Sequence, residues 1–310
     1  MSSGEADLEG PLGALIAPFQ RLCCQQNNSV DRDIQDHTGR VLPATGLDEE
    51  RVPFAGKQVA ADAMVGVEDR PETTVEDGAT YRGQWKNNLR HGQGFLRRRD
   101  GQTYKGEFYE GMPHGLGVFR AANGNTYEGQ WHWDQAHGQG KFVHIDGSSY
   151  EGQWCEDEKS GFGVETWKDG ARYEGQFAKG GKHGHGTYES GTGIKYTGQF
   201  VNDRMDGEGT YKFVDGRIYV GQWKQGHMHG KGKMTWTSGS TYEGDYSMDV
   251  KSGSGTYTWP NGQVYRGQWS NGKQDGYGEF TDASGVKTSG EWKDGEPLRP
   301  PGGVDGHSVI

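Results

Sequence analysis

The sequence has little cysteine and no long apolar run. Its 310 residues include three cysteines, Cys23, Cys24 and Cys155, which are too few for a disulfide framework. No apolar stretch approaches the roughly 18 residues that a membrane-spanning helix requires, and no secretory signal is recognisable. These absences predict a cytoplasmic protein.

Aliphatic material and excess positive charge are also scarce. Hydrophobic residues make up 31% of the chain and the mean hydropathy is −0.95, which excludes a large globular core. The net charge is −10, and residues 1–78, with six Lys or Arg against fifteen Asp or Glu, account for −9 of it. The remainder is nearly neutral at −1, which argues against general nucleic-acid binding.

The sequence does contain a repeat of 23 residues without insertion or deletion. A tenth copy starts at Thr288 and lacks the opening tyrosine. The nine complete copies open at Tyr81, Tyr104, Tyr127, Tyr150, Tyr173, Tyr196, Tyr219, Tyr242 and Tyr265. A fixed period of this size is typical of stacked-repeat architectures.

Each copy predicts two antiparallel strands. Counting the tyrosine as position zero, the copy from Tyr127 has Gly129 at position two and Trp131 at position four, separated by polar residues, which predicts a strand with one aromatic and one polar face. Glycines follow at positions eleven and thirteen, and position fifteen is usually aromatic. In six copies Asp-Gly or Asn-Gly then predicts a tight turn.

These positions also predict a register. If position four faces position eleven, then two faces thirteen and zero faces fifteen, and the aromatic face carries a central row made only of glycine. Glycine weakens a strand, so a whole row of it needs a reason. We expect the bare backbone to let the sheet fold into a trough that the flanking rings fill.

The motif YEGQW, followed by HGQG, an aromatic residue and DG, resembles the MORN repeat (membrane occupation and recognition nexus) over roughly Ala79 to Gly295. The resemblance implies an all-β, elongated, single-layer antiparallel meander of about ten repeats, in a protein of the MORN-only type. The predicted organisation is a flexible acidic arm over residues 1–78, a repeat array over 79–295 and a disordered tail over 296–310.

The resemblance implies a non-catalytic scaffold or adaptor that links cytoskeletal, ciliary, flagellar or cortical proteins to one another or to a membrane. Such a protein would lie at the inner face of a membrane, at the cell cortex or at the base of a cilium or flagellum. We expect an extended peptide or a helix to lie along the trough. The candidate contacts are the rings of Tyr150, Trp154, Tyr173, Tyr219, Trp223, Tyr265 and Trp269, for each of which a pure packing role is the alternative.

Direct binding of anionic phospholipids, including phosphoinositides, is the alternative function. The first repeat is rich in basic residues, and Arg90, Arg97, Arg98 and Arg99 are predicted to contact either lipid phosphates or the acidic arm. Cys23 and Cys24 follow a short amphipathic stretch and are candidate S-palmitoylation sites, with an unmodified tail as the alternative.

No arrangement of acid, base and nucleophile points to an enzyme, and no cofactor is expected. Histidines recur at position ten, but equivalent positions lie about 10 Å apart, too far to share a zinc ion, so no metal site is predicted. MORN arrays accompany phosphoinositide kinase and histone methyltransferase domains, but the residues before Ala79 are too few for either. The open edge of the last strand predicts a homodimer formed through the C-terminal end of the array.

Overall fold

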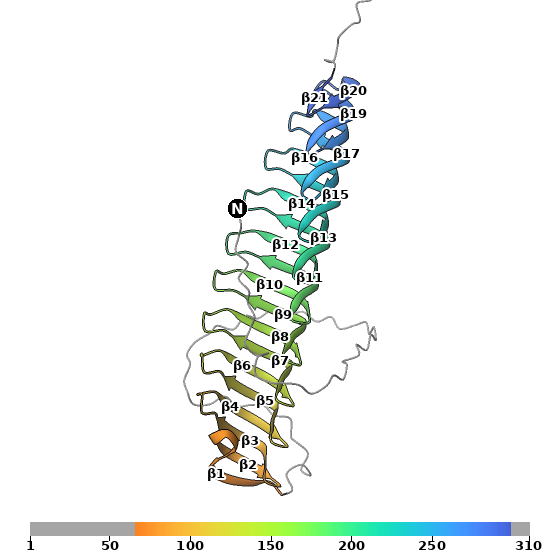
Figure 1. The fold of residues 1–310 in the computed structure, drawn as a ribbon. Helices are drawn as coiled ribbons and strands as arrows, with labels where there is room; N and C mark the ends of the chain where they lie inside the picture. Colours follow the sequence, from red (N-terminus) through yellow and green to blue (C-terminus); the bar gives the residue numbers. More distant parts are fainter. Residues whose placement is uncertain (1–65, 299–310) are drawn as a thin grey trace, which may run out of the picture. The chain divides into compact units, whose positions relative to one another are not determined.

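The alternating repeat positions form the predicted strands. The computed structural model describes residues 66–298, which contain 21 antiparallel strands, one 3-10 turn and no α-helix. Each strand pairs with the next in chain order, so the described residues form one continuous sheet (Figure 1). The all-β meander predicted from the repeat is therefore confirmed.

The strands alternate between seven and nine residues from β2 to β20, two per repeat. The elements are β1 (Glu68–Thr74), η2 (Glu76–Gly78), β2 (Thr80–Lys86), β3 (Leu89–Arg97), β4 (Thr103–Tyr109), β5 (Met112–Arg120), β6 (Thr126–His132), β7 (Gln135–Val143), β8 (Ser149–Cys155), β9 (Glu158–Thr166), β10 (Arg172–Ala178), β11 (Gly181–Glu189), β12 (Lys195–Val201), β13 (Arg204–Lys212), β14 (Ile218–Lys224), β15 (His227–Thr235), β16 (Thr241–Ser247), β17 (Val250–Thr258), β18 (Val264–Ser270), β19 (Lys273–Thr281), β20 (Lys287–Lys293) and β21 (Glu296–Pro297).

The predicted register is right for two of its three pairs and wrong for the third. In the β6–β7 hairpin, Tyr127 pairs with Phe142 and Gly129 with Gly140, as expected for positions zero with fifteen and two with thirteen. Trp131, however, pairs with Ala136 at position nine, and a bulge separates these pairs. Position eleven faces the position-four aromatic of the following copy instead, as in the pair of Gly138 with Trp154.

Turn geometry explains the difference. Trp133 and Asp134 have φ values of 50° and 65°, the backbone of a two-residue hairpin turn of type I′. That turn places position five opposite position eight, and the residues left over on the longer strand form the bulge. Gly138 lies in the bulge with φ of 61°, which requires a residue that tolerates the left-handed region.

The aromatic face of the sheet, called the ring face, holds the core. Tyr150 meets the ring of Trp154 in its own repeat and that of Phe177 in the next, edge to face and with centroids 5.0 Å apart in both pairs. The Tyr150 hydroxyl donates a hydrogen bond of 2.9 Å to the carbonyl of Gln153, and the Trp154 indole donates one of 2.9 Å to Gly140. Because these contacts recur along the array, the rings form one continuous packed row.

The glycine row gives those rings their space. A Cβ atom added to Gly140 would lie 2.3 Å from the hydroxyl oxygen of Tyr127, and one added to Gly129 would lie 2.4 Å from the Cα of Gly140. Real Cβ contacts are not this short, so the tyrosine ring occupies the volume that a side chain would need. The glycine row therefore makes room for the flanking rings, which is the part of the expectation that these contacts confirm.

The sheet continues beyond both ends of the repeat array. β1 and η2 precede residue 79, β1 pairs with β2, and Val75 packs against the core. All strands belong to one unit, which begins at Val67. At the other end, Glu296 and Pro297 pair with β20, and the Leu298 amide donates to the carbonyl of Glu291.

Candidate functional site

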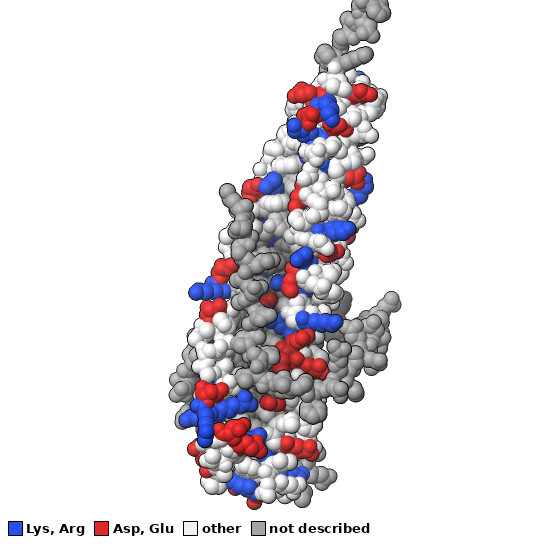
Figure 2. All heavy atoms as spheres, in the orientation of Figure 1, with Lys and Arg blue, Asp and Glu red and all other residues white. Residues whose placement is uncertain are grey.

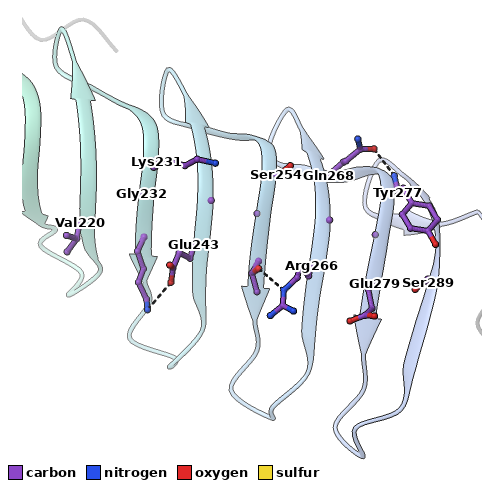
Figure 3. Close-up of a pocket in the computed structure, with 16 residues that line it drawn as sticks. Val220, Lys231, Gly232, Glu243, Ser254, Arg266, Gln268, Tyr277, Glu279 and Ser289 are labelled. Atoms are coloured by element: carbon purple, nitrogen blue, oxygen red, sulfur yellow. Dashed lines mark hydrogen bonds and ion pairs between the residues drawn. The ribbon is translucent and has the colours of Figure 1, made fainter.

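The face opposite the rings, called the polar face, is shaped by the bulge in each hairpin. The bulge leaves the backbone N–H of position twelve without a strand partner, and the side chain at position three accepts its hydrogen bond. Gln153 accepts from Phe162 at 2.6 Å, and Gln268 accepts from Tyr277 at 2.8 Å (Figure 3). A Gln, Glu or Asp does so in all nine complete repeats. The glutamine of YEGQW thus has a structural role that is not evident from the repeat pattern.

The bulge also exposes large apolar side chains on the polar face. Phe162 is 53% exposed and Tyr277 is 62% exposed, and both stand at position twelve. Val220, at position one of its repeat, is 51% exposed. The buried aromatics of the ring face have no such exposure, so side chains such as these offer apolar surface that a partner can reach.

A hollow of about 1080 Å³ lies on the polar face and crosses strands β14 to β20 (Figure 3). Its floor is the backbone of the glycine row, and Val220, Arg266 and Tyr277 are among the side chains around it. The Arg266 Nε donates to the Thr256 hydroxyl at 3.4 Å, and no ion pair within residues 66–298 involves this guanidinium. A smaller hollow of about 680 Å³ on β7 to β9 has Phe162 at its edge.

The seven rings proposed to contact a partner lie in the core. Tyr150 is 1% exposed, Trp154 is 5% exposed and the other five are buried to the same degree. Their edges and faces are occupied by neighbouring rings, so a partner cannot reach them without displacing packed aromatics. Their burial favours the packing role, and burial also raises the pKa of Tyr265 to about 12.

The four arginines predicted to act together point to different places. Arg90 donates from Nε and Nη2 to the carbonyl of Gly111 at 3.0 and 2.8 Å, and its Nη2 lies 3.9 Å from a Glu76 carboxylate oxygen. Arg90 therefore joins the first two repeats and η2. Arg98 donates to the side chain of Gln102 in the β3–β4 turn at 3.1 Å, and Arg99 lies against Gly78.

Arg97 instead joins cations from other strands on the polar face. Arg82 and Lys105 both pair with Phe95, and Arg97 and Arg120 both pair with Thr103. All four cationic side chains are exposed. We call Arg82, Arg97, Lys105 and Arg120 the cationic patch; these residues are far apart in the sequence, and only strand pairing brings them together.

Rings also gather on the polar face of β3 to β7. Tyr109, His114 and Trp133 lie within 5.7 Å of one another by ring centroid, and His132 lies 5.3 Å from His114. Burial, followed by the charge of His132, lowers the pKa of His114. No group of three or more His, Cys, Asp or Glu side chains in residues 66–298 is arranged to hold a metal ion.

The lipidation and dimerisation predictions are left open. Cys23 and Cys24 lie outside the described residues. Within residues 66–298, no helix is both long enough and apolar enough to cross a membrane. β21 covers only the end of β20, by pairing with Trp292 and Lys293, so the dimer through this edge stays a prediction.

Comparison with known proteins identifies the repeat. The family model described as "MORN repeat" matches nine successive segments, at residues 81–103, 104–126, 127–149, 150–172, 173–195, 196–216, 219–241, 242–264 and 265–287. No curated protein matches the chain.

Solved structures show only a distant likeness. The TCP10 domain of Danio rerio CPAP in complex with a STIL peptide is 10% identical, with a TM-score of 0.37 over 71% of this chain and 98% of that one. The TCP domain of Drosophila melanogaster SAS-4 in complex with a proline-rich motif of Ana2 is 12% identical, with a TM-score of 0.29 over 68% and 94%. At these scores the superpositions are too loose to establish a common fold.

Proposed function

The chain belongs to the MORN repeat family, and we propose that it is a scaffold that binds an extended segment of a partner protein along the polar face of β14 to β20. MORN repeat proteins are typically interaction scaffolds rather than enzymes. The proposed role is to link cytoskeletal, ciliary or cortical proteins to one another or to a membrane.

The hollow over the glycine row is the observation that carries this proposal. It crosses seven consecutive strands, and strands lie about 4.8 Å apart, so it offers a surface about 30 Å long. A peptide of about nine residues in extended conformation covers that length. Val220 and Tyr277 supply exposed apolar contacts, and the two Nη groups of the Arg266 guanidinium supply four N–H donors for a carboxylate or for carbonyl groups.

Selection from a library of random peptides on the full-length chain tests this proposal. We expect selected peptides to bind wild type and to lose about tenfold in affinity with the double variant Tyr277→Ser/Arg266→Gln, measured by fluorescence anisotropy. Phe162→Ser is the matched control, because Phe162 occupies the same repeat position at the other hollow. Equal binding by both variants, or a library without any enriched peptide, would contradict the proposal.

A further inference from the structure

One lysine of the ring face is enclosed by aromatic side chains. The Nζ of Lys251, on β17, lies within 6.0 Å of four ring centroids: those of Trp269 at 4.3 Å, Tyr257 at 5.2 Å, Tyr242 at 5.4 Å and Trp236 at 6.0 Å. The rings come from β16, β17, β18 and the turn after β15. Four rings around one amine replace much of the water that an exposed ammonium group would have around it.

The enclosure is not closed off from solvent. Tyr242 and Trp269 are buried, whereas Trp236, Tyr257 and Lys251 itself are half-buried. The amine therefore lies near the surface of the ring face, where a small reagent can approach it.

Within residues 66–298, Lys251 also has no carboxylate partner. In the view of Figure 2, many blue side chains lie beside red ones, and fifteen ion pairs within 4.0 Å join described residues, but none involves Lys251. The titratable groups that face its amine are phenols: those of Tyr242 and Tyr257 in the enclosure, and that of Tyr246, which pairs with Lys251 across the β16–β17 hairpin. Burial raises the pKa of Tyr242 and of Tyr246 above the usual range, so both are neutral near pH 7.

The neighbouring repeats supply no charge at the equivalent position. Repeat position nine is Met228 in the repeat before Lys251 and Gln274 in the repeat after it. Burial therefore acts on the ammonium group without an opposing charge, and it lowers the pKa of Lys251. The neutral amine, which has a free electron pair, is then a larger fraction near neutral pH than at an ordinary exposed lysine.

Two other lysines at repeat position nine show what Lys251 lacks. Lys159 and Lys182 also lie over rings, with Nζ 5.3 Å and 5.2 Å from the nearest ring centroid. Lys159, however, forms an ion pair with Glu165, and Lys182 forms one of 3.2 Å with Asp203. A carboxylate at this distance favours the charged form of an amine.

The repeat of Lys251 has neither carboxylate. The position of Glu165 is taken by Tyr257, and that of Asp203 is taken by Gly272. The backbone amides of Asp203 and Gly272 both donate a hydrogen bond of 3.0 Å to the carbonyl of a lysine at position nine, so an aspartate in place of Gly272 would stand where Asp203 stands. Of the three enclosed lysines, Lys251 is therefore the one without an opposite charge among the described residues.

We propose that Lys251 is an acylation site that reacts directly with acyl thioesters. The neutral Nζ attacks the thioester carbonyl carbon, a C–N amide bond forms, and the C–S bond breaks so that the thiolate leaves with its electron pair. The proton that the nitrogen loses passes to the thiolate or to solvent. The amide product carries no charge, so acylation removes an ammonium group from apolar surroundings.

Incubation of the full-length chain with acetyl coenzyme A, followed by peptide mapping with mass spectrometry, tests the proposal. Near pH 7.5, the initial rate of acetylation at Lys251 should exceed the rates at Lys159 and Lys182 in the same molecules by about tenfold. As the pH is raised, the rate at Lys251 should level off at a lower pH than the rate at Lys224, an exposed lysine at the end of β14.

Two substitutions restore a carboxylate beside Lys251. Tyr257→Glu and Gly272→Asp should each slow its acetylation about tenfold, whereas the matched neutral variants Tyr257→Gln and Gly272→Asn should not. In the reverse direction, Glu165→Gln should speed acetylation of Lys159. Because the two acidic variants change different parts of the fold, misfolding of one leaves the other as a test.

Three results would overturn the proposal: no acetylation at Lys251, equal rates at the three lysines of position nine, or a rate at Lys251 that both acidic variants leave unchanged. A rate that falls equally in the acidic and the neutral variants would also overturn it, because the loss would then follow from a disturbed enclosure and not from charge.

Discussion

A single methyl group at the glycine row should separate two adjacent strands. The Cβ of Gly129→Ala would lie 2.4 Å from the Cα of Gly140 and 2.6 Å from the carbonyl oxygen of Gln139. Both are backbone atoms, so no side-chain rotation relieves the contact and the strands must part by about 1 Å. Overpacking of this kind costs about 1–3 kcal/mol, and loss of the Tyr127 hydroxyl hydrogen bond adds about 1 kcal/mol. We expect a total of about 3 kcal/mol.

Gly290→Ala is the matched control, because Gly290 stands at the same repeat position with nothing within 4 Å of its added Cβ. It should be neutral or stabilise by about 0.4–1 kcal/mol, since alanine restricts the unfolded chain. Hydrogen exchange of peptides from β6 and β7 measures the effect locally, which suits repeats that contact only their neighbours. Protection there should fall about a hundredfold in Gly129→Ala. Protection within a factor of two of wild type would refute the argument, as would an equal loss at β20 in Gly290→Ala.

Four further outcomes are expected. Gln153→Leu should destabilise its hairpin by about 1 kcal/mol in denaturant titration, because it leaves the bulge amide without an acceptor, and Gln153→Glu should not. The pKa of Tyr265 is raised to about 12, so its contribution to stability should be lost as pH rises from about 10, the unfolded value, towards 12; the difference in phenolate absorbance between wild type and Tyr265→Phe measures that titration. The pKa of His114 is lowered in the folded state, so acidification through about 6.5 should destabilise wild type more than His114→Gln in thermal melts. Cys23→Ser/Cys24→Ser should lower the membrane-bound fraction in cell fractionation, and an unchanged fraction would rule out acylation at these cysteines.

The fold could be predicted largely because one period dictates it. Tyrosine, glycine and aromatic residues alternate on a fixed strand face, so the ring face and the glycine row followed from repeat positions alone. The bulge did not follow from those positions. The two-residue turn at positions six and seven pairs position five with position eight, and this leaves position eleven opposite the next repeat instead of opposite position four. The glycine at position eleven, which is left-handed at Gly138, is the sequence signal for the bulge. The same sequence is equally consistent with glycines at positions eleven and thirteen that belong to one row of a regular strand.

The candidate sites were harder to predict than the fold. The exposure of a ring depends on which face of the sheet carries it. Trp154 and Tyr277 both lie in aromatic-rich strands, and the sequence does not show that the ring of Trp154 is buried and that of Tyr277 is exposed. Arg90 pairs with Trp85 only because of the shifted register, and its guanidinium donates to the carbonyl of Gly111 in the next hairpin. Arg82 and Arg120 are 38 positions apart, and only the pairing of four strands brings them onto one surface.

The pairing of every strand with its neighbours in chain order has a mechanical consequence. Tension between the two ends of the sheet acts along the inter-strand hydrogen bonds, so it opens them one strand at a time instead of shearing many at once. One 23-residue unit occupies about 10 Å in the sheet and about 75 Å when pulled out. A stretched array would therefore lengthen in steps, as its end units open first. The units that have not yet opened would keep their surfaces intact.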